Sequence, residues 1–498
     1  MNERLAEAAY ARLPVFLQNA VCAAWGWREA RTRLGPEFRR RLDELAASEG
    51  WSRARIDAWQ DEQVARMVKH AYERVPFYRE RMRAAGVSPA DVRGRADLAR
   101  LPVVTKEDVR ASSGAMLAEN ADRRALRARH TSGTTGSSLH FYTTAAAVAF
   151  QWAVWWRHRR RHGVEPGMLH ANFTGKLVVP LRQTRPPYWR WNPAAGQALL
   201  NMQHVTPANI RPIIEFLDAE PFVFWSGYPS IIHAVAATAL EAGLSLRNPP
   251  RVVDTGAENV LDLQRRDITR LTGARMIDQY GFSEGCGNAS SCPHGRYHED
   301  FEFGVLECLN PEPLPGGRVR GEIVATGLAC PEFPFIRYRV GDTGVWEPEG
   351  FRCPCGRESR VLAWVEGRQD DYVITPEGTR VMRFDYLFKD THRVRECQVV
   401  QERLGEITLR VVRRPGYGAA DERTIEGEVR RWISPTLKVR FDYVERLERE
   451  RSGKFRAVKS LLPRGMGTSG TAGGAAEAEA GASGPGPDQG GGQGPRRG

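Results

Sequence analysis

No apolar run in the 498-residue sequence is long enough to cross a membrane. The longest apolar stretches, residues 145–150 and 152–156, are separated by Gln151 and fall well short of the ~18 uninterrupted residues that a span requires. Acidic side chains at Glu3 and Glu7 are not typical of a secretory signal. We therefore expect a cytoplasmic protein without a transmembrane segment.

Lysine is scarce, since only seven of the 72 Lys and Arg residues are lysines, although the net charge is +12. An arginine bias with frequent Ala and Gly is typical of a GC-rich coding sequence, and the basic residues are scattered, so we do not expect nucleic acid as a partner. One dense run contains Arg157, Arg159, Arg160 and Arg161. We interpret this run as a solvated helix face or as the rim of a site for an anionic substrate.

Cysteine is also infrequent, and eight cysteines in so long a chain do not form a disulfide framework. Four of them stand singly in helix-like or strand-like patterns and are expected to be buried free thiols: Cys22, Cys308, Cys330 and Cys397. The other four lie near turn residues: Cys286, Cys292, Cys353 and Cys355.

The length predicts two or three units with a large buried interior. Residues 1–115 have helical periodicity, and residues 116–368 alternate short apolar runs with helical patterns before becoming richer in strands. Residues 369–462 change to a compact α+β pattern, and the Gly-rich residues 463–498 lack the apolar bulk to order. We predict an α/β fold: a large N-terminal α/β domain with sheets flanked by helices and a strand-rich subdomain, and a small mobile α+β C-terminal domain.

A hydroxyl-rich loop gives the strongest local signal: Thr131, Ser132, Gly133, Thr134, Thr135 and Gly136. Two glycines free the backbone to curl, and exposed amides and hydroxyls are the donors that phosphate oxygens require. Ser137 stands where the P-loop of common nucleotide hydrolases has lysine. On composition alone, a Ser- and Thr-rich hairpin turn explains the segment equally well.

Four further motifs follow in order: YGFSE at 280–284, YRVGD at 338–342, GRQDD at 367–371 and SGKFR at 452–456. With the loop at 131–136, this series resembles the adenylate-forming superfamily of acyl-CoA synthetases, adenylation domains and luciferases. Within it the chain is most similar to the phenylacetate-CoA ligase branch, particularly CapK and coenzyme F390 synthetase-like members. That similarity covers about residues 14–460 and includes Gln18-Asn19, HAYERVPFYR at 70–79, LPVVTK at 101–106, GYPS at 227–230 and VITPEG at 373–378.

The resemblance implies ATP, magnesium and CoA as cofactors. It also implies a role for each position that matches a family motif. The loop from Thr131 to Gly136 would hold the ATP phosphates, although it lacks the Pro-Lys that often follows its second glycine. Tyr280 would stack on the adenine, and Asp342 would accept hydrogen bonds from the ribose hydroxyls. The full set of remaining nucleotide-binding residues is Gly256, Ala257, Glu258, Tyr280, Gly281, Ser283 and Asp342. Glu284 would help hold magnesium, Arg368 would lie nearby, Asp370 would be the hinge, and Lys454 would neutralise charge at the α-phosphate.

A second constellation predicts structural zinc. Cys292 and His298 occupy one short segment, and Cys353 and Cys355 occupy another, and such thiolate and imidazole ligands suit tetrahedral zinc. The same pattern recurs in relatives of the resembled family. His294 or Cys286 could replace a ligand, and four reduced thiols are the alternative without metal.

Taken together, these features predict an ATP-dependent enzyme that activates a carboxylic acid, of the aryl class in our interpretation, as acyl-AMP and transfers the acyl group to CoA. One alternative is an F390 synthetase-like adenylyltransferase to a hydroxyl acceptor, or a CapK-type enzyme of capsular or cell-surface polysaccharide biosynthesis. A non-enzyme alternative is a nucleotide-binding zinc scaffold, against which Glu284, Asp342 and Lys454 argue. Trp152, Trp155 and Trp156 either line the acyl pocket or belong to the core.

Overall fold

The computed structural model describes residues 9–130, 139–174, 177–368, 372–377, 380–381, 384, 387, 391, 393–450 and 454–462. The helices that precede the main sheet are α2 (Val15–Arg33), α3 (Pro36–Ser48), α4 (Arg53–Arg74), α5 (Pro76–Ala84) and α6 (Lys106–Ser112). Helix α4 begins at Arg53, where the Ser52 side chain accepts a hydrogen bond from the Arg55 amide. At the start of α6, Thr105 and Asp108 form a capping box.

One sheet of twelve strands forms the large domain, in the order β11-β12-β13-β14-β10-β9-β8-β7-β6-β3-β5-β4. Its parallel part contains β3 (His170–Thr174), β5 (Gln197–Asn201), β6 (Phe224–Gly227), β7 (Val252–Gly256) and β8 (Arg275–Gly281). The antiparallel strands are β4 (Trp189–Asn192), β9 (Asn288–Ser291), β10 (Tyr297–Glu299), β11 (Gly304–Pro313), β12 (Val319–Gly327), β13 (Tyr338–Trp346) and β14 (Val361–Arg368). The mixed α/β architecture is therefore confirmed, and its strand-rich part continues the same sheet.

Four helices accompany the parallel strands: α7 (Ala145–Arg160), α8 (Ile210–Ala219), α9 (Pro229–Glu241) and α10 (Asp262–Thr272). Apolar side chains of α8 and α9 pack with those of β3, β5 and β6 in one buried cluster that includes Ile213, Trp225 and Val235. This packing holds the carboxyl ends of β6, β7 and β8 next to one another.

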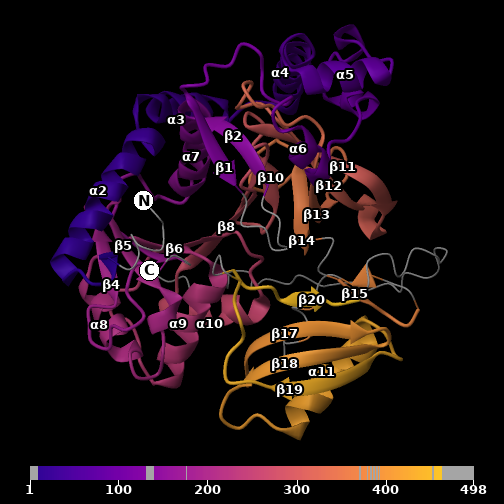
Figure 1. Ribbon diagram of the computed structural model, residues 1–498. Helices are drawn as coiled ribbons and strands as arrows, with labels where there is room; N and C mark the ends of the chain where they lie inside the picture. Colours follow the sequence, from indigo (N-terminus) through magenta and orange to yellow (C-terminus); the bar gives the residue numbers. More distant parts are fainter. Residues whose placement is uncertain are drawn as a thin grey trace, which may run out of the picture.

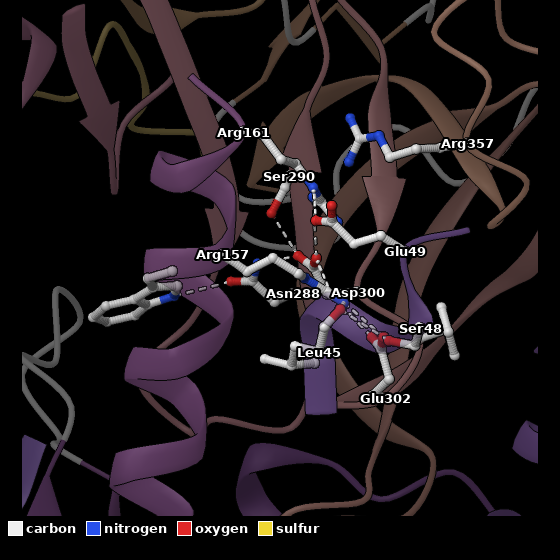
Figure 2. A network of polar contacts seen from close by, with 12 residues as sticks. Leu45, Ser48, Glu49, Arg157, Arg161, Asn288, Ser290, Asp300, Glu302 and Arg357 are labelled. Atoms are coloured by element: carbon white, nitrogen blue, oxygen red, sulfur yellow. Dashed lines mark hydrogen bonds and ion pairs between the residues drawn. The ribbon is translucent and has the colours of Figure 1, made fainter. Parts of the chain in front are cut away.

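The arginine run at the end of α7 is neither a solvated face nor a substrate rim, because most of it is paired inside the protein. Figure 2 shows the buried Arg157 between Asp300 and Glu302, with nitrogen–oxygen distances of 2.8 and 2.6 Å. Arg159 pairs with buried Asp254 at 2.7 Å. Burial of a charge is tolerated only where partners satisfy it, so the run fixes α7 to the sheet.

A separate four-stranded sheet lies toward the C-terminus, in the order β19-β18-β17-β20, with α11 (Ala419–Trp432) packed on it. Its strands are β17 (Val394–Arg403), β18 (Glu406–Arg413), β19 (Lys438–Tyr443) and β20 (Val458–Ser460). Figure 1 shows this small sheet, in orange and yellow, beside α10 of the larger body. Leu263 of α10 belongs to its apolar cluster, so the two units share buried contacts.

Short strands complete the described structure: β1 (Leu126–His130) pairs with β2 (His140–Thr144), and β15 (Val373–Ile374) pairs with β16 (Arg380–Val381). No helix in the described ranges has the length and apolarity needed to cross a bilayer. All eight cysteines are free thiols, of which Cys22 and Cys397 are buried as expected, whereas Cys308 and Cys330 are half-buried.

Candidate functional site

The candidate site lies where β6, β7 and β8 end side by side. Gly227 at the end of β6 has φ 149°, and an added Cβ would lie 2.2 Å from the Phe173 carbonyl oxygen, so only glycine fits this turn. Gly256 ends β7, and Ala257 follows with φ 68°. The next strand ends at Tyr280 and Gly281. The carboxyl ends of parallel strands are the usual place for a ligand in open α/β sheets.

Tyr280 and Asp342 meet across 62 positions of sequence. The Tyr280 hydroxyl donates a 2.8 Å hydrogen bond to Asp342 Oδ2. Burial raises the pKa of Tyr280 well above its ordinary value, and the Asp342 charge adds to the shift, so the hydroxyl stays a neutral donor. Asp342 lies opposite Arg368 in the β13–β14 pair, so the structure brings the backbones of these two predicted residues together.

Glu284 is held by a tyrosine that has no role in the sequence analysis above. The hydroxyl of Tyr338 donates a 2.7 Å hydrogen bond to Glu284 Oε1, and Tyr338 is fully buried. Burial and the neighbouring carboxylate raise the pKa of Tyr338 far above its ordinary range. The tyrosine therefore orients Glu284 as a permanent donor. Tyr338 begins the YRVGD motif, but the sequence pattern does not indicate its contact with Glu284.

Glu258 joins the large domain to the segment that carries Lys454. Its Oε1 accepts a 2.6 Å hydrogen bond from the Phe455 amide and a 3.1 Å bond from the Ser230 hydroxyl, while Oε2 accepts from the Ser230 amide. Burial raises the pKa of Glu258 above its ordinary value, although these donors oppose the shift. The structure thus places the backbone of Lys454 at the ends of β6 and β7 through its neighbour Phe455.

Several predicted residues lie outside the described structure: the loop from Thr131 to Gly136, the hinge residue Asp370 and the side chain of Arg368. The strands that flank the loop, β1 and β2, pair antiparallel with His130 opposite His140. Gly281 and Ser283 are exposed near the Tyr280 ring.

The three tryptophans of α7 all contact one apolar cluster of the core. Trp156 is buried against Phe224 in an edge-to-face contact with ring centroids 6.2 Å apart. Trp152 and Trp155 are half-buried, and their ring centroids lie 5.1 Å apart. Trp155 Nε1 donates a hydrogen bond to Asn288 Oδ1. Trp156 therefore belongs to the core, and Trp152 and Trp155 pack against the same apolar cluster while staying partly exposed.

The four predicted zinc ligands, Cys292, His298, Cys353 and Cys355, come together with their ligand atoms within 4.8 Å of one another. Cys292 Sγ lies 3.7 Å from Cys353 Sγ, and Cys355 Sγ lies 3.2 Å from His298 Nε2. Zn–S bonds of about 2.3 Å in a tetrahedron require sulfur atoms about 3.8 Å apart, so the thiol pair fits. Neither alternative, His294 or Cys286, belongs to this group of four.

Comparison with known proteins agrees with this architecture. The family described as the CapK C-terminal domain matches residues 373–461. Protein CapK of Staphylococcus aureus is 27% identical over 284 residues, which are 57% of this chain and 61% of that protein. The phenylacetate-coenzyme A ligase of Thermus thermophilus is 30% identical over 340 residues, covering 65% of this chain and 72% of that enzyme.

Among solved structures, 2-hydroxyisobutyryl-CoA ligase in its postadenylation state has a TM-score of 0.65 at 20% identity, with 82% of this chain and 91% of that chain covered. The same ligase in the thioesterification state has a TM-score of 0.51 at 22% identity, with 83% and 91% covered. The fold is thus that of the adenylate-forming enzymes. Within that class, the chain belongs to the phenylacetate-CoA ligase family, and it is also similar to CapK.

Proposed function

We propose that this protein is an ATP-dependent, adenylate-forming ligase that activates a carboxylic acid as acyl-AMP and transfers the acyl group to CoA. The observation that carries the proposal is the hydrogen bond between Glu258 and the Phe455 amide, because it brings the Lys454 segment to the ends of β6 and β7. Family membership supports the same chemistry, since several relatives are phenylacetate-CoA ligases.

In the first half-reaction, a carboxylate oxygen of the acid would attack the α-phosphorus of ATP, and the bond to pyrophosphate would break. Negative charge grows on the α-phosphate oxygens, and Lys454 would neutralise it there. Asp342, oriented by Tyr280, would accept hydrogen bonds from the ribose hydroxyls. In the second half-reaction, the CoA thiolate would attack the acyl carbon and release AMP.

The candidate site offers a carboxylate that suits magnesium. Mg²⁺ in nucleotide sites usually takes one or two carboxylates together with phosphate oxygens and water. Glu284 is a half-buried carboxylate fixed by Tyr338 near the strand ends, so it would be the protein ligand. When bound, the ion would offset phosphate charge during adenylation.

Zinc fits the group of Cys292, His298, Cys353 and Cys355, and its role would be structural. Four protein ligands leave no open position for a substrate, which is typical of structural rather than catalytic zinc. The ligands come from the β9–β10 hairpin and from the segment between β13 and β14, so the metal would tie the antiparallel part of the sheet together.

The chain as a whole resembles one state of a solved ligase more than another. The TM-score to 2-hydroxyisobutyryl-CoA ligase is 0.65 for the postadenylation state and 0.51 for the thioesterification state. This difference supports rotation of the small unit, residues 369–462, between two poses, with Asp370 as the proposed hinge.

Acid-dependent release of pyrophosphate, measured over a panel of carboxylic acids with and without CoA, tests the proposal. We expect aryl acids such as phenylacetate to be the best substrates, because several relatives are phenylacetate-CoA ligases. Acyl-CoA should accumulate only when CoA is present. Pyrophosphate release that no acid stimulates would contradict the proposal.

A second candidate is favoured by the CapK C-terminal match at residues 373–461. In that case no acyl-AMP forms: a hydroxyl oxygen of the acceptor would attack the α-phosphorus of ATP, pyrophosphate would leave, and AMP would stay on the acceptor. Adenine-labelled ATP distinguishes the two: label that remains on a hydroxyl acceptor indicates adenylyl transfer, whereas free AMP together with acyl-CoA indicates the CoA ligase.

A further inference from the structure

Helix α2 places its polar and small residues inward. Gln18, Cys22 and Gly26 are buried, and an added Cβ on Gly26 would collide with the Asn192 side chain. Arg190 Nε donates to Gln18 Oε1 at 2.7 Å. Figure 1 shows α2, in indigo, along the outer edge of the molecule beside β4, which is the last strand of the sheet. The helix therefore covers this edge with hydrogen bonds and close backbone packing.

The opposite face of α2 carries its large apolar side chains. Phe16 is 70% exposed, Trp27 60%, Val21 45% and Leu17 39%. Two leucines of a neighbouring loop extend the surface: Leu177 and Leu181, 49% and 64% exposed. These six side chains, called the α2 patch below, are six of the ten large hydrophobics that are exposed in the described ranges.

The loop that carries the two leucines is tied to the start of the helical region. The Tyr10 hydroxyl donates to the Val178 carbonyl at 2.7 Å, and Arg182 donates to the Ala11 carbonyl. The α2 patch is therefore one surface built from two segments of chain. Such clustering is unlike single exposed apolar residues, and it marks a contact surface.

The charges within the two segments that build the α2 patch have one sign. Residues 9–28 and 177–205, which build this surface, contain no Asp or Glu. Their exposed charged side chains are all arginines: Arg12, Arg28, Arg182 and Arg185. The first carboxylate after this stretch, Glu29, lies 2.6 Å from Arg33 and is 26% exposed.

We propose that the α2 patch docks on the surface of an anionic lipid bilayer. Phe, Leu, Val and Trp side chains on one helix face, flanked by arginines, suit the boundary between acyl chains and headgroups, where Trp is favoured. A second copy of the chain fits less well, because a symmetric contact would oppose the arginines of both copies. A nucleic acid would satisfy the arginines and leave six apolar side chains against phosphates.

Co-sedimentation of the full-length protein with vesicles tests the proposal directly. Vesicles of phosphatidylcholine with phosphatidylglycerol are compared with vesicles of phosphatidylcholine alone, at about 0.1 M and about 1 M salt, between which the Debye length falls from about 10 to about 3 Å. We expect binding to the anionic vesicles at low salt, and at least a tenfold weaker apparent affinity for neutral vesicles or at high salt.

Two variants separate the apolar and the charged contributions. Phe16→Ser with Trp27→Ser should lower the affinity for anionic vesicles at least tenfold, and Arg12→Gln with Arg28→Gln should remove most of the preference for anionic lipid. Because these side chains are exposed, the thermal unfolding midpoint should stay within a few degrees of the parent value.

Leu404→Ser with Leu461→Ser is the matched control, since these leucines of the small domain are 55% and 51% exposed but lie outside the α2 patch. This control should bind vesicles as the parent does. Absence of binding to anionic vesicles at low salt would overturn the proposal. A dimer in light scattering that dissociates in the Phe16→Ser, Trp27→Ser variant, without vesicle binding, would assign the surface to a second copy instead.

Discussion

In this structure the small C-terminal unit lies against α9 and α10, an arrangement called the docked pose below. A cluster of charges at this boundary predicts how the docked pose is stabilised. Arg395, in β17, lies 3.0 Å from Glu241 at the end of α9 and also donates to the Thr238 hydroxyl. Arg414, just after β18, lies 3.4 Å from Glu241 and forms a short hydrogen bond to Asp267 of α10. Glu241 is thus the carboxylate that both arginines of the small domain share.

The perturbation is Glu241→Gln, which keeps the size of the side chain and removes its charge. Glu241 is 25% exposed and its partners are 21% and 14% exposed, so the ion pairs are partly shielded from water. Hydrogen bonds to charged groups contribute about 1.5–3 kcal/mol when shielded, whereas exposed ion pairs contribute about 1 kcal/mol or less. We therefore expect a loss of about 1–2 kcal/mol of docking free energy, equal to a roughly 5- to 30-fold shift toward the undocked pose.

Energy transfer between fluorophores placed on α9 and α11 measures this shift without reference to catalysis. Glu215→Gln is the matched control, since Glu215 is an exposed carboxylate on α8. The Glu241→Gln variant should show a larger population at long distance, and high salt should move the parent protein in the same direction. Identical distance distributions for Glu241→Gln, Glu215→Gln and the parent would refute the reasoning.

Four further predictions concern the site and the core. Lys454→Ala should lower acid-dependent pyrophosphate release on the order of a hundred-fold with nearly unchanged ATP affinity, because the lysine acts on developing charge; equal rates in a folded variant would contradict its role. Glu258→Ala should lower the same rate about tenfold through loss of a charge-assisted hydrogen bond, whereas Glu258→Gln should retain more activity, and equal loss in both would exclude the acceptor role. Metal analysis should find one zinc per chain, and Cys353→Ser with Cys355→Ser should remove it and lower the unfolding temperature; a stable, metal-free parent would favour reduced thiols. Burial raises the pKa of Asp278 to about 7, so its contribution to stability, relative to Asp278→Asn, should fall by up to about 4 kcal/mol as pH rises from about 4 to about 7, and a constant difference in urea unfolding would contradict the shift.

Local elements could be predicted from the sequence where pattern and length decide the structure. Within the α+β pattern of residues 369–462, the sequence predicts a strand at 406–413 and a helix at 421–433, and the structure has β18 (Glu406–Arg413) and α11 (Ala419–Trp432) there. The edge strand β4 (Trp189–Asn192) was missed because its four residues alternate in burial without an apolar run. That β11 and β4 end the same twelve-stranded sheet follows from long-range pairing, which no local pattern encodes.

The candidate site was predictable to the extent that its residue types are diagnostic. Thiols and imidazole in two short segments have few other uses, and the four expected zinc ligands do converge. Tyr338 was missed because a tyrosine beside an arginine has many structural uses, and only its distance of 2.7 Å from Glu284 reveals its role. The arginine run of α7 was misinterpreted because its partners, Asp300 and Glu302, lie more than 140 positions away.

Two groups of contacts contribute to the free energy of docking, and their contributions have opposite signs. At Glu241, opposite charges attract across the domain boundary and favour docking. At Glu258, the segment of the small domain that contains Phe455 lies against a carboxylate whose pKa burial raises above its ordinary value, although the Phe455 and Ser230 donors oppose the shift. The proposed alternation of the small domain between two poses would need such a compromise, because a docking interface without a cost would hold Lys454 in place after adenylation and block the second half-reaction.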